Sequence, residues 1–239
     1  MAGTEGKDSK KAIISTGHGE IDRRLGGGLP IGSLTLIEGE SDAGKSVLCQ
    51  QMIWGSLNDG YNALLFTTEN TVRSLIKQMD SLGLGILDYL LLGRFKIFPI
   101  KQSTFQVQAN ETFITLLTTI EQMKGYHLVI IDALTPILPI ASDVEILHYF
   151  ERCKHFCDEG RTIVNVTHSY ALDSGVFIRV RSASDAHLRL VIEKVGDKLV
   201  KTLEVAKVRG AVSTTGNVVT FDVEPEVGMK IMPLSKAKA

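Results

Sequence analysis

Short apolar runs alternate with longer amphipathic segments along most of the chain. The runs are typical of buried parallel strands, and they predict strands over 33–38, 63–68, 127–132 and 161–167, with a further strand at 94–98. Between them apolar residues recur at helical spacing, which predicts helices over 45–58, 71–82, 111–124 and 143–159. Residues 170–184 fit either a helix or an irregular segment.

Strands that alternate with helices imply a mainly parallel sheet with helices on both faces, a three-layer α/β core. The pattern changes near residue 187. Residues 187–195 and 198–208 alternate apolar and polar positions around Gly196-Asp197, which is typical of a β-hairpin, and 218–223 with 228–232 indicate another. We therefore expect the α/β core to finish in antiparallel strands.

The domain organisation follows from the same pattern. No linker or repeat interrupts residues 12–232, so they are predicted to form one domain, with polar tails at 1–11 and 233–239. The N-terminal tail lacks the apolar core of a secretion signal, and no apolar run is long enough to span a bilayer. A cytoplasmic protein is expected, one that would meet a membrane only through a partner.

Composition changes this picture little. A net charge of −1 over 239 residues gives no general attraction to nucleic acid or anionic lipid. Cys153 and Cys157 are four residues apart in a predicted helix and could suggest a metal pair, but no partner ligands follow at zinc spacing. Together with Cys49 they are interpreted as small apolar side chains in a reducing compartment.

Residues 39–46, Gly-Glu-Ser-Asp-Ala-Gly-Lys-Ser, match the P-loop pattern G-x-x-x-x-G-K-[ST] between a predicted strand and a predicted helix. Successive backbone N–H groups and the positive end of the helix dipole would hold a polyphosphate. Lys45 would reach the β- and γ-phosphates, and the Ser46 hydroxyl would ligate Mg²⁺. The alternative is a glycine-rich turn. The predicted ATP-binding residues are Gly39, Glu40, Ser41, Asp42, Ala43, Gly44, Lys45, Ser46 and Val47.

Carboxylates follow two of the predicted strands. Asp132 ends the apolar run 127–132, where a carboxylate could hold Mg²⁺ together with Ser46; the alternative is a turn or cap residue. Glu69 follows the strand 63–68 and could orient or deprotonate an attacking water, or it could simply begin a helix. Thr167 and His168 end the strand 161–167 and could sense the γ-phosphate, although a buried histidine with satisfied hydrogen bonds explains the pattern equally well.

The segment before the P-loop resembles the opening of KaiC-type ATPases of the RecA superfamily. Ser15-Thr-Gly-His-Gly-Glu-Ile-Asp22 and the turn Leu25-Gly-Gly-Gly-Leu-Pro-Ile-Gly32 match the family pattern. The resemblance covers nearly the whole chain between 12 and 232 and continues through Thr67-Thr68-Glu69, Asp132 and Lys207-Val208-Arg209-Gly210. It implies a RecA-like core that binds ATP and Mg²⁺.

The resemblance also implies an assembly. KaiC-like rings, which are commonly hexamers, place the catalytic glutamate where Glu69 falls, and their Lys-x-Arg pair, here Lys207 and Arg209, reaches the γ-phosphate bound by a neighbouring subunit. Two cations at a strand end can neutralise phosphoryl charge only by approaching from outside. The alternative is that both residues lie on a solvated strand end.

Within the family, the single-domain length and Lys45-Ser46-Val-Leu-Cys-Gln50 are most similar to the ATP-binding proteins of the archaeal motility motor, the archaellum. This resemblance implies a cytoplasmic regulator docked beneath the membrane-bound motor. Its partners would be the motor ATPase and the surrounding scaffold protein. ATP occupancy would control assembly, and hydrolysis would be slow or absent.

Two departures from the family fit a binding role. The clock proteins carry adjacent glutamates where this chain has Glu69-Asn70, and the P-loop carries Glu40 and Asp42, whose charges are unfavourable beside a triphosphate unless they point away. An active ATPase or autokinase remains one alternative. A recombinase-like DNA-binding ATPase is another, although the only nearby cations are scattered ones such as Arg179, Arg181 and Arg189.

Overall fold

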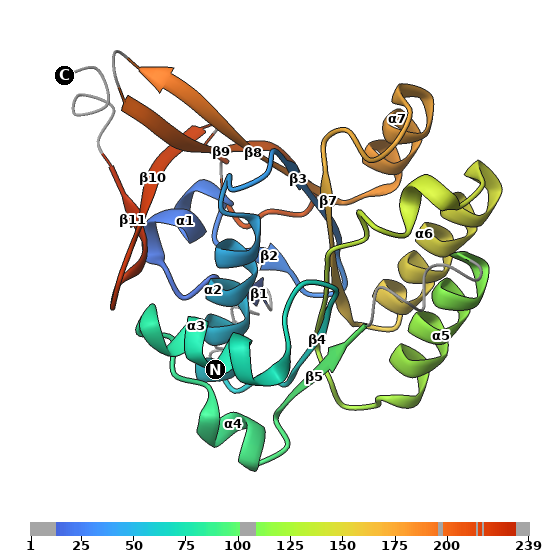
Figure 1. The fold of residues 1–239 in the computed structure, drawn as a ribbon, viewed down its shortest axis with the longest axis horizontal. Coiled ribbons are helices and arrows are strands. Elements are labelled where there is room, and N and C mark those ends of the chain that lie inside the picture. The colour runs from blue at the N-terminus through green and yellow to red at the C-terminus, as the bar shows by residue number, and fades with distance from the viewer. Residues whose placement is uncertain (1–12, 101–108, 196–197, 214, 217, 233–239) are drawn as a thin grey trace, which may run out of the picture.

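The computed structural model describes residues 13–100, 109–195, 198–213, 215–216 and 218–232. The predicted tails 1–11 and 233–239 and the predicted hairpin turn Gly196-Asp197 lie outside the described residues. Figure 1 shows the chain folded around one large twisted sheet, with helices on both of its faces.

Nine strands form this sheet within the described residues, in the order β11-β10-β9-β8-β3-β7-β6-β4-β5. The six strands from β8 to β5 run parallel to one another, and β9, β10 and β11 continue the sheet as antiparallel strands. The strands are β3 (Leu34–Gly39), β4 (Ala63–Thr67), β5 (Phe95–Pro99), β6 (Leu128–Asp132), β7 (Thr162–His168), β8 (Ala186–Val195), β9 (Lys198–Val208), β10 (Val218–Glu224) and β11 (Gly228–Ile231).

The predicted fold class is confirmed: a mainly parallel sheet ends in antiparallel strands. The structure adds one feature to the first predicted hairpin. Its strand β8 pairs antiparallel with β9 on one side and parallel with β3 on the other, with Thr35 opposite Ala186. Alternation of apolar and polar residues indicates a strand, but it does not indicate the direction of the neighbouring strand.

The helices divide between the two faces of the sheet (Figure 1). One face carries α1 (Gly19–Arg24), α2 (Lys45–Asn58), α3 (Val72–Ser81) and α4 (Leu87–Leu91). The other carries α5 (Ala109–Gln122), α6 (Asp143–Asp158) and α7 (Ser174–Ala183). The ambiguous segment 170–184 is therefore helical from Ser174 onward. The short elements α1, α4, β1 (Ile13–Ile14), β2 (Leu29–Pro30) and the 3₁₀ turn η2 (Leu138–Ile140) were not predicted.

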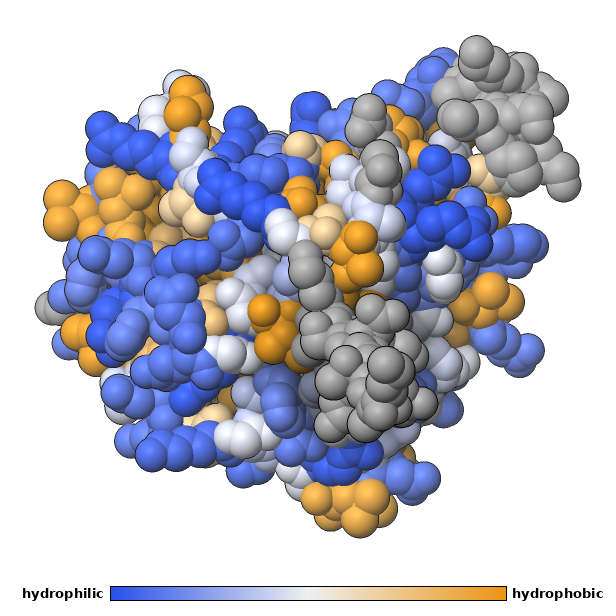
Figure 2. All heavy atoms as spheres, turned by 180° about the vertical axis from the view of Figure 1, so that it is seen from behind, coloured by the Kyte–Doolittle hydropathy of each residue, from blue (hydrophilic) through white to orange (hydrophobic). Residues whose placement is uncertain are grey.

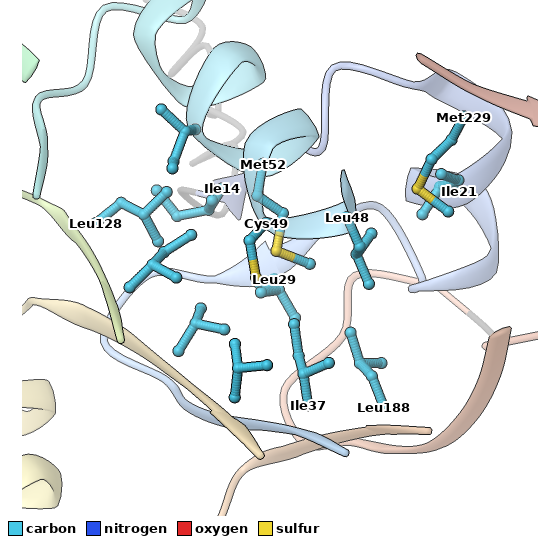
Figure 3. Packing of buried hydrophobic residues seen from close by; sticks show 14 of the residues in the cluster. Ile14, Ile21, Leu29, Ile37, Leu48, Cys49, Met52, Leu128, Leu188 and Met229 are labelled. Atoms are coloured by element: carbon cyan, nitrogen blue, oxygen red, sulfur yellow. The ribbon is translucent and has the colours of Figure 1, made fainter. Parts of the chain in front are cut away.

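Each face of the sheet has its own hydrophobic core. Under α2, the buried side chains of Leu48 and Met52 pack toward Ile37 and Leu188 of the sheet, as Figure 3 shows. The second core joins the opposite face of the sheet to α5, α6 and α7. The helix α2 is buried over most of its length, and its Gly55 permits a close approach, because a Cβ there would lie 2.3 Å from the backbone nitrogen of Gly17. Helix α2 is thus held rigidly between the sheet and the N-terminal segment.

The surface is mostly hydrophilic on the face opposite to that in Figure 1, and the hydrophobic residues there form separate small patches (Figure 2). In the part of the chain that the structure describes, no helix combines the length and the apolar character needed to cross a membrane.

The N-terminal segment is fastened by one carboxylate. Asp22 of α1 accepts hydrogen bonds from the Ser15 hydroxyl (2.6 Å), the Thr16 hydroxyl (2.7 Å) and the Thr16 backbone N–H (2.8 Å). Thr16 is completely buried. Because this segment packs against Gly55, the three hydrogen bonds also fix the position of α2 relative to α1.

We expect Asp22→Ala to lower the free energy of unfolding by about 2–3 kcal/mol, because it leaves buried donors without an acceptor. The matched control is Glu20→Ala on the same helix, since Glu20 only forms a surface ion pair with Arg24 at 3.7 Å and its loss should cost less than about 1 kcal/mol. Denaturant unfolding followed by circular dichroism would measure both. Equal stabilities of the two variants would contradict this account of Asp22.

Candidate functional site

Two glycines shape the turn between β3 and α2. A Cβ on Gly39 would lie 2.3 Å from the Leu190 carbonyl oxygen of β8, so only glycine permits β3 to approach its neighbour there. Gly44 is the N-cap of α2 with φ of 95°, and a Cβ on it would lie 3.0 Å from the Phe221 ring. No side chain caps the first turn of α2, so its backbone N–H groups are available to a ligand.

A cleft of about 340 Å³ opens at this turn. It lies at the carboxyl ends of β3, β4, β6 and β7, where parallel α/β sheets bind their ligands. Its lining combines the P-loop and the N-terminal turn of α2 with residues of β4, α3, β6, β7, β9 and β10 or the loops that follow them. These residues are Ser41, Asp42, Gly44, Lys45, Ser46, Val47, Glu69, Gln78, Asp132, Ala133, His168, Lys201 and Val223.

Most of the predicted ATP-binding residues line this cleft, together with the predicted metal ligands Ser46 and Asp132 and the predicted catalytic residue Glu69. Three of the P-loop residues do not contribute lining side chains. Gly39 packs against β8, Glu40 is exposed, and Ala43 is completely buried. Thr167 is 1% exposed and donates its hydroxyl hydrogen to the His168 carbonyl at 3.3 Å, so it lies beneath the cleft.

The Lys45 side chain is held inside the P-loop. It is 7% exposed, and its ammonium donates hydrogen bonds to the carbonyl oxygens of Gly39 (3.3 Å) and Glu40. Burial lowers the pKa of Lys45, and the carboxylates of Asp132 and Glu69 act in the opposite direction. The ammonium therefore lies between the loop and the two acids. There the oxygens of a polyphosphate could replace the carbonyl oxygens as its hydrogen-bond acceptors.

The side chains of Asp132 and Ser46 form a hydrogen bond close to Lys45. The pKa of Asp132 is raised to about 6: burial is the main cause and the negative charge of Glu69 adds to it, while a hydrogen bond with Ser46 and the charge of Lys45 act in the opposite direction. A hydroxyl and a carboxylate are hard oxygen ligands of the kind that Mg²⁺ takes from proteins, usually one or two at a time. This pair therefore fits the predicted metal role.

Hydrogen bonds between the ends of β4 and β6 place Glu69 close to Asp132. The backbone N–H of Thr68 donates to the Asp132 carbonyl at 3.0 Å, and the Ala133 N–H donates to the Thr68 hydroxyl oxygen at 3.2 Å. The hydroxyl in turn donates to the Ala133 carbonyl at 3.3 Å. Glu69, the next residue, is exposed at the cleft. Its carboxylate can therefore face a reacting phosphate and water.

His168 closes the cleft from β7. Its Nδ1 lies 3.3 Å from the Ser41 hydroxyl of the P-loop, and its ring centroid lies 5.1 Å from that of Tyr170. Burial lowers the pKa of His168, and the Lys45 ammonium lowers it further. The imidazole is therefore favoured in its neutral form, in which it can exchange a hydrogen bond with Ser41.

The structure does not bring Lys207 and Arg209 into this cleft. Lys207 pairs with His187 of β8, three residues before Leu190, which pairs with Gly39. That offset is about 10 Å along the strand, toward the edge of the sheet opposite the P-loop. Arg209 lies two residues further in the same direction. Neither cation can contact a phosphate held by its own P-loop without a large movement.

The Lys207 side chain instead lies at the C-terminal end of α7. The Lys207 ammonium donates to the carbonyl oxygens of Arg181 (2.7 Å) and Ser182 (3.5 Å), where the negative end of the helix dipole favours a cation. Burial lowers the pKa of Lys207, and Arg209 lowers it further. The Arg209 backbone N–H donates to the Asp185 carbonyl at 2.8 Å.

A buried ion-pair cluster lies between these cations and the P-loop. Glu38, the residue before Gly39, is 1% exposed and accepts three hydrogen bonds from Arg181 at 2.7–3.1 Å. His187 lies 3.3 Å away and Arg189 3.9 Å away. Burial acts to raise the pKa of Glu38, but hydrogen bonds with His187 and Arg181 outweigh it, so the pKa falls below its ordinary value. Two of the three cations considered for DNA binding are therefore engaged internally.

Sequence analysis missed four residues that line the cleft: Gln78, Ala133, Lys201 and Val223. Ala133 directly follows Asp132 and could have been found from the strand end. The other three come from α3, β9 and β10, and no motif marks them. Their position depends on the packing of the C-terminal strands against α2 and α3.

Comparisons with known proteins identify the family of the chain. A family model described as "ATPase: KaiC" matches residues 14–236. The chain is 28% identical over 229 residues to the archaeal flagellar ATP-binding protein FlaH of Sulfolobus acidocaldarius, covering 95% of this chain and 100% of that protein. For FlaH of Methanocaldococcus jannaschii the identity is 27% over 221 residues, with coverages of 92% and 95%. The crystal structure of the flagellar accessory protein FlaH from Methanocaldococcus jannaschii matches with a TM-score of 0.80 and 26% identity, covering 94% of this chain and 100% of that one.

The raised pKa of Asp132 makes stability depend on pH. Its folded-state pKa of about 6 exceeds the ordinary value of 3.8, so the unfolded chain releases this proton first as the pH rises. The contribution of Asp132 to the free energy of unfolding, in the protein without nucleotide or magnesium, should therefore fall by about 2–3 kcal/mol between pH 4 and pH 7.

Asp132→Asn, which cannot ionise, should lack this contribution. Denaturant unfolding of both proteins in EDTA at pH 4.5, 6 and 7.5 measures the difference. We expect the variant to gain stability relative to wild type as the pH rises. A difference that stays constant with pH would show that Asp132 is not held in a protonation-sensitive environment.

Proposed function

Because the chain belongs to the KaiC family of ATPases, we propose that it is an ATP-binding regulatory component of the archaeal motility motor. The observation that carries this proposal is the cleft itself, in which the N-terminus of α2, Lys45, Ser46 and Asp132 converge. The similarity to FlaH proteins along nearly their whole length supports the choice of the archaellum.

Nucleotide binding would use the amides of the turn around Gly44 for the phosphates. Lys45 would exchange its carbonyl contacts for β- and γ-phosphate oxygens. Ser46 and Asp132 would hold Mg²⁺, which when bound would neutralise part of the phosphate charge. The metal would also favour the ionised form of Asp132, whose pKa burial otherwise raises.

We propose that hydrolysis is slow or absent. Glu69 is the one carboxylate of the described residues placed to orient water, and it is followed by Asn70 rather than by a second glutamate. Asp42 lines the cleft with φ of 60° and adds negative charge on the phosphate side. ATP that stays bound for a long time suits a switch, because a partner protein can then respond to whether the cleft is occupied.

The second candidate is an active ATPase or autokinase, and the placement of Glu69 favours it. A turnover assay separates the two candidates. Rates of several per second that vanish in Glu69→Gln would favour the enzyme, because general-base or water-positioning catalysis would then be operating.

Lys207 and Arg209 are proposed to act on the ATP of a neighbouring subunit. Their distance from their own P-loop supports a contact between chains. The alternative is that they serve only this edge of their own chain, where Lys207 binds the carbonyl end of α7. A ring, which the family resemblance suggests to be a hexamer, would place this edge of one subunit at the cleft of the next.

The switch needs differential affinity, since a ligand shifts only an equilibrium between states that it binds unequally. ATP would order the cleft and the neighbouring edge, and the motor ATPase and its scaffold protein would bind that ordered state better. The protein would then act at the cytoplasmic side of the membrane through these partners.

Lys45→Ala should abolish retention of ATP, because it removes the ammonium that neutralises the phosphates, and should also abolish ATP-dependent binding of the motor ATPase. Isothermal titration with Mg-ATP and a pull-down with and without ATP measure the two effects. Lys77→Ala, an exposed lysine on α3 outside the cleft, is the control and should behave as wild type. A Lys45→Ala protein that still regulates its partner normally would defeat the proposal.

The double variant Lys207→Ala/Arg209→Ala should bind Mg-ATP with an affinity within about twofold of wild type, since neither side chain touches its own site, yet lose ATP-dependent assembly. Light scattering with size exclusion, with and without ATP, measures the mass. Lys194→Ala on the same pair of strands is the matched control. Normal ATP-dependent assembly of the double variant would contradict a role of the two cations between subunits.

A further inference from the structure

The cleft extends beyond the phosphate site on the side away from Asp132. In the sheet, β7 and β6 lie on one side of β3, and β8, β9 and β10 lie on the other. Asp132, Glu69 and His168 line the first side, and Lys201 and Val223 line the second. With metal and γ-phosphate at the acidic side, the nucleoside must extend toward β9 and β10.

That second side is closed by α3. The backbone N–H of Glu226, in the turn between β10 and β11, donates to the Ser81 carbonyl of α3 at 2.8 Å. A Cβ on Gly83 would lie 2.4 Å from the Glu226 carbonyl oxygen, so the contact is tight. Figure 1 shows α3 beside α2 on the side of β10 and β11. Gln78, three residues before Ser81, therefore lines the nucleoside end of the cleft.

The polar group of this end is an amide pair. Gln50 of α2 is 2% exposed, and its Nε2 donates to the Gln78 Oε1 at 2.9 Å. The Gln50 Oε1 is buried and has no hydrogen-bond partner among the described residues. Burying a polar amide costs free energy unless it is hydrogen-bonded, and the one partner of the Gln50 amide in the described parts of the chain is the exposed Gln78 at the cleft. The lining of the cleft also includes the aliphatic side chains of Val47 and Val223 and, from β9, the cation Lys201.

We infer that Gln78 reads the nucleotide base and that Gln50 positions it, with the base between Val47 and Val223. This inference rests on the proposed binding of a nucleoside triphosphate at the P-loop. An amide offers a donor beside an acceptor, and the N6–N7 edge of adenine offers the complementary pair, whereas the same edge of guanine offers two acceptors. The site would thus select ATP over GTP.

The test compares ATP, GTP and inorganic tripolyphosphate, each with Mg²⁺, by isothermal titration. Wild type should bind ATP about tenfold more tightly than GTP. Gln78→Leu should weaken ATP binding about tenfold, bring the ATP/GTP ratio close to one and leave tripolyphosphate unchanged. Gln50→Leu should lower the same ratio by a smaller factor without lowering the unfolding midpoint. Gln122→Leu, an exposed glutamine at the end of α5, should match wild type.

The phosphate probe separates two kinds of failure. If wild type binds neither ATP nor tripolyphosphate, the proposed function itself fails. If wild type binds both but does not distinguish ATP from GTP, or if Gln78→Leu retains the ratio, base reading by Gln78 is overturned. Equal losses of ATP and tripolyphosphate binding in Gln78→Leu would also overturn it, because general damage to the cleft would then explain the effect.

Discussion

The close approach of backbone to backbone at the end of β3 is the constraint on which the rest of the site depends. Gly39 lies against the Leu190 carbonyl, and Gly44 lies over the Phe221 ring, so the turn between them passes directly from sheet to helix. Any side chain at either position would push α2 away from β8 and β10. The amide donors of α2 can face a polyphosphate only because this turn is tight.

The order of the strands also gives the two sides of the cleft different side chains. Toward β7 and β6 the cleft holds acids, a hydroxyl and an imidazole, which suit a metal ion and phosphate. Toward β9 and β10 it holds Lys201, the aliphatic Val223 and the Gln78 amide, where the base is inferred to lie. The strand order, with β3 between them, places the P-loop at the junction of the two.

A chain of contacts joins the P-loop to the edge proposed to meet a neighbouring subunit. Glu38 precedes Gly39 and binds the Arg181 guanidinium, and the carbonyl of the same Arg181 accepts a hydrogen bond from Lys207. Breaking a buried ion pair by removing one partner is costly, so Glu38 and Arg181 should stay together. Helix α7 is thereby held at two points: the Arg181 side chain binds Glu38, and the C-terminal carbonyls of the helix accept hydrogen bonds from Lys207.

The sequence by itself determined the elements and the centre of the site. Apolar runs and helical spacing are local properties, and the P-loop pattern places its glycines, Lys45 and Ser46 within a few residues. The carboxyl ends of parallel strands meet at one edge, so Asp132, Glu69 and His168 could be expected near it. Only the tertiary structure decided that β8 pairs parallel with β3, that Lys207 faces away from its own P-loop, and that Gln78 reaches the cleft. These features arise from contacts between segments far apart in the chain, and no local pattern encodes which distant surfaces pack together.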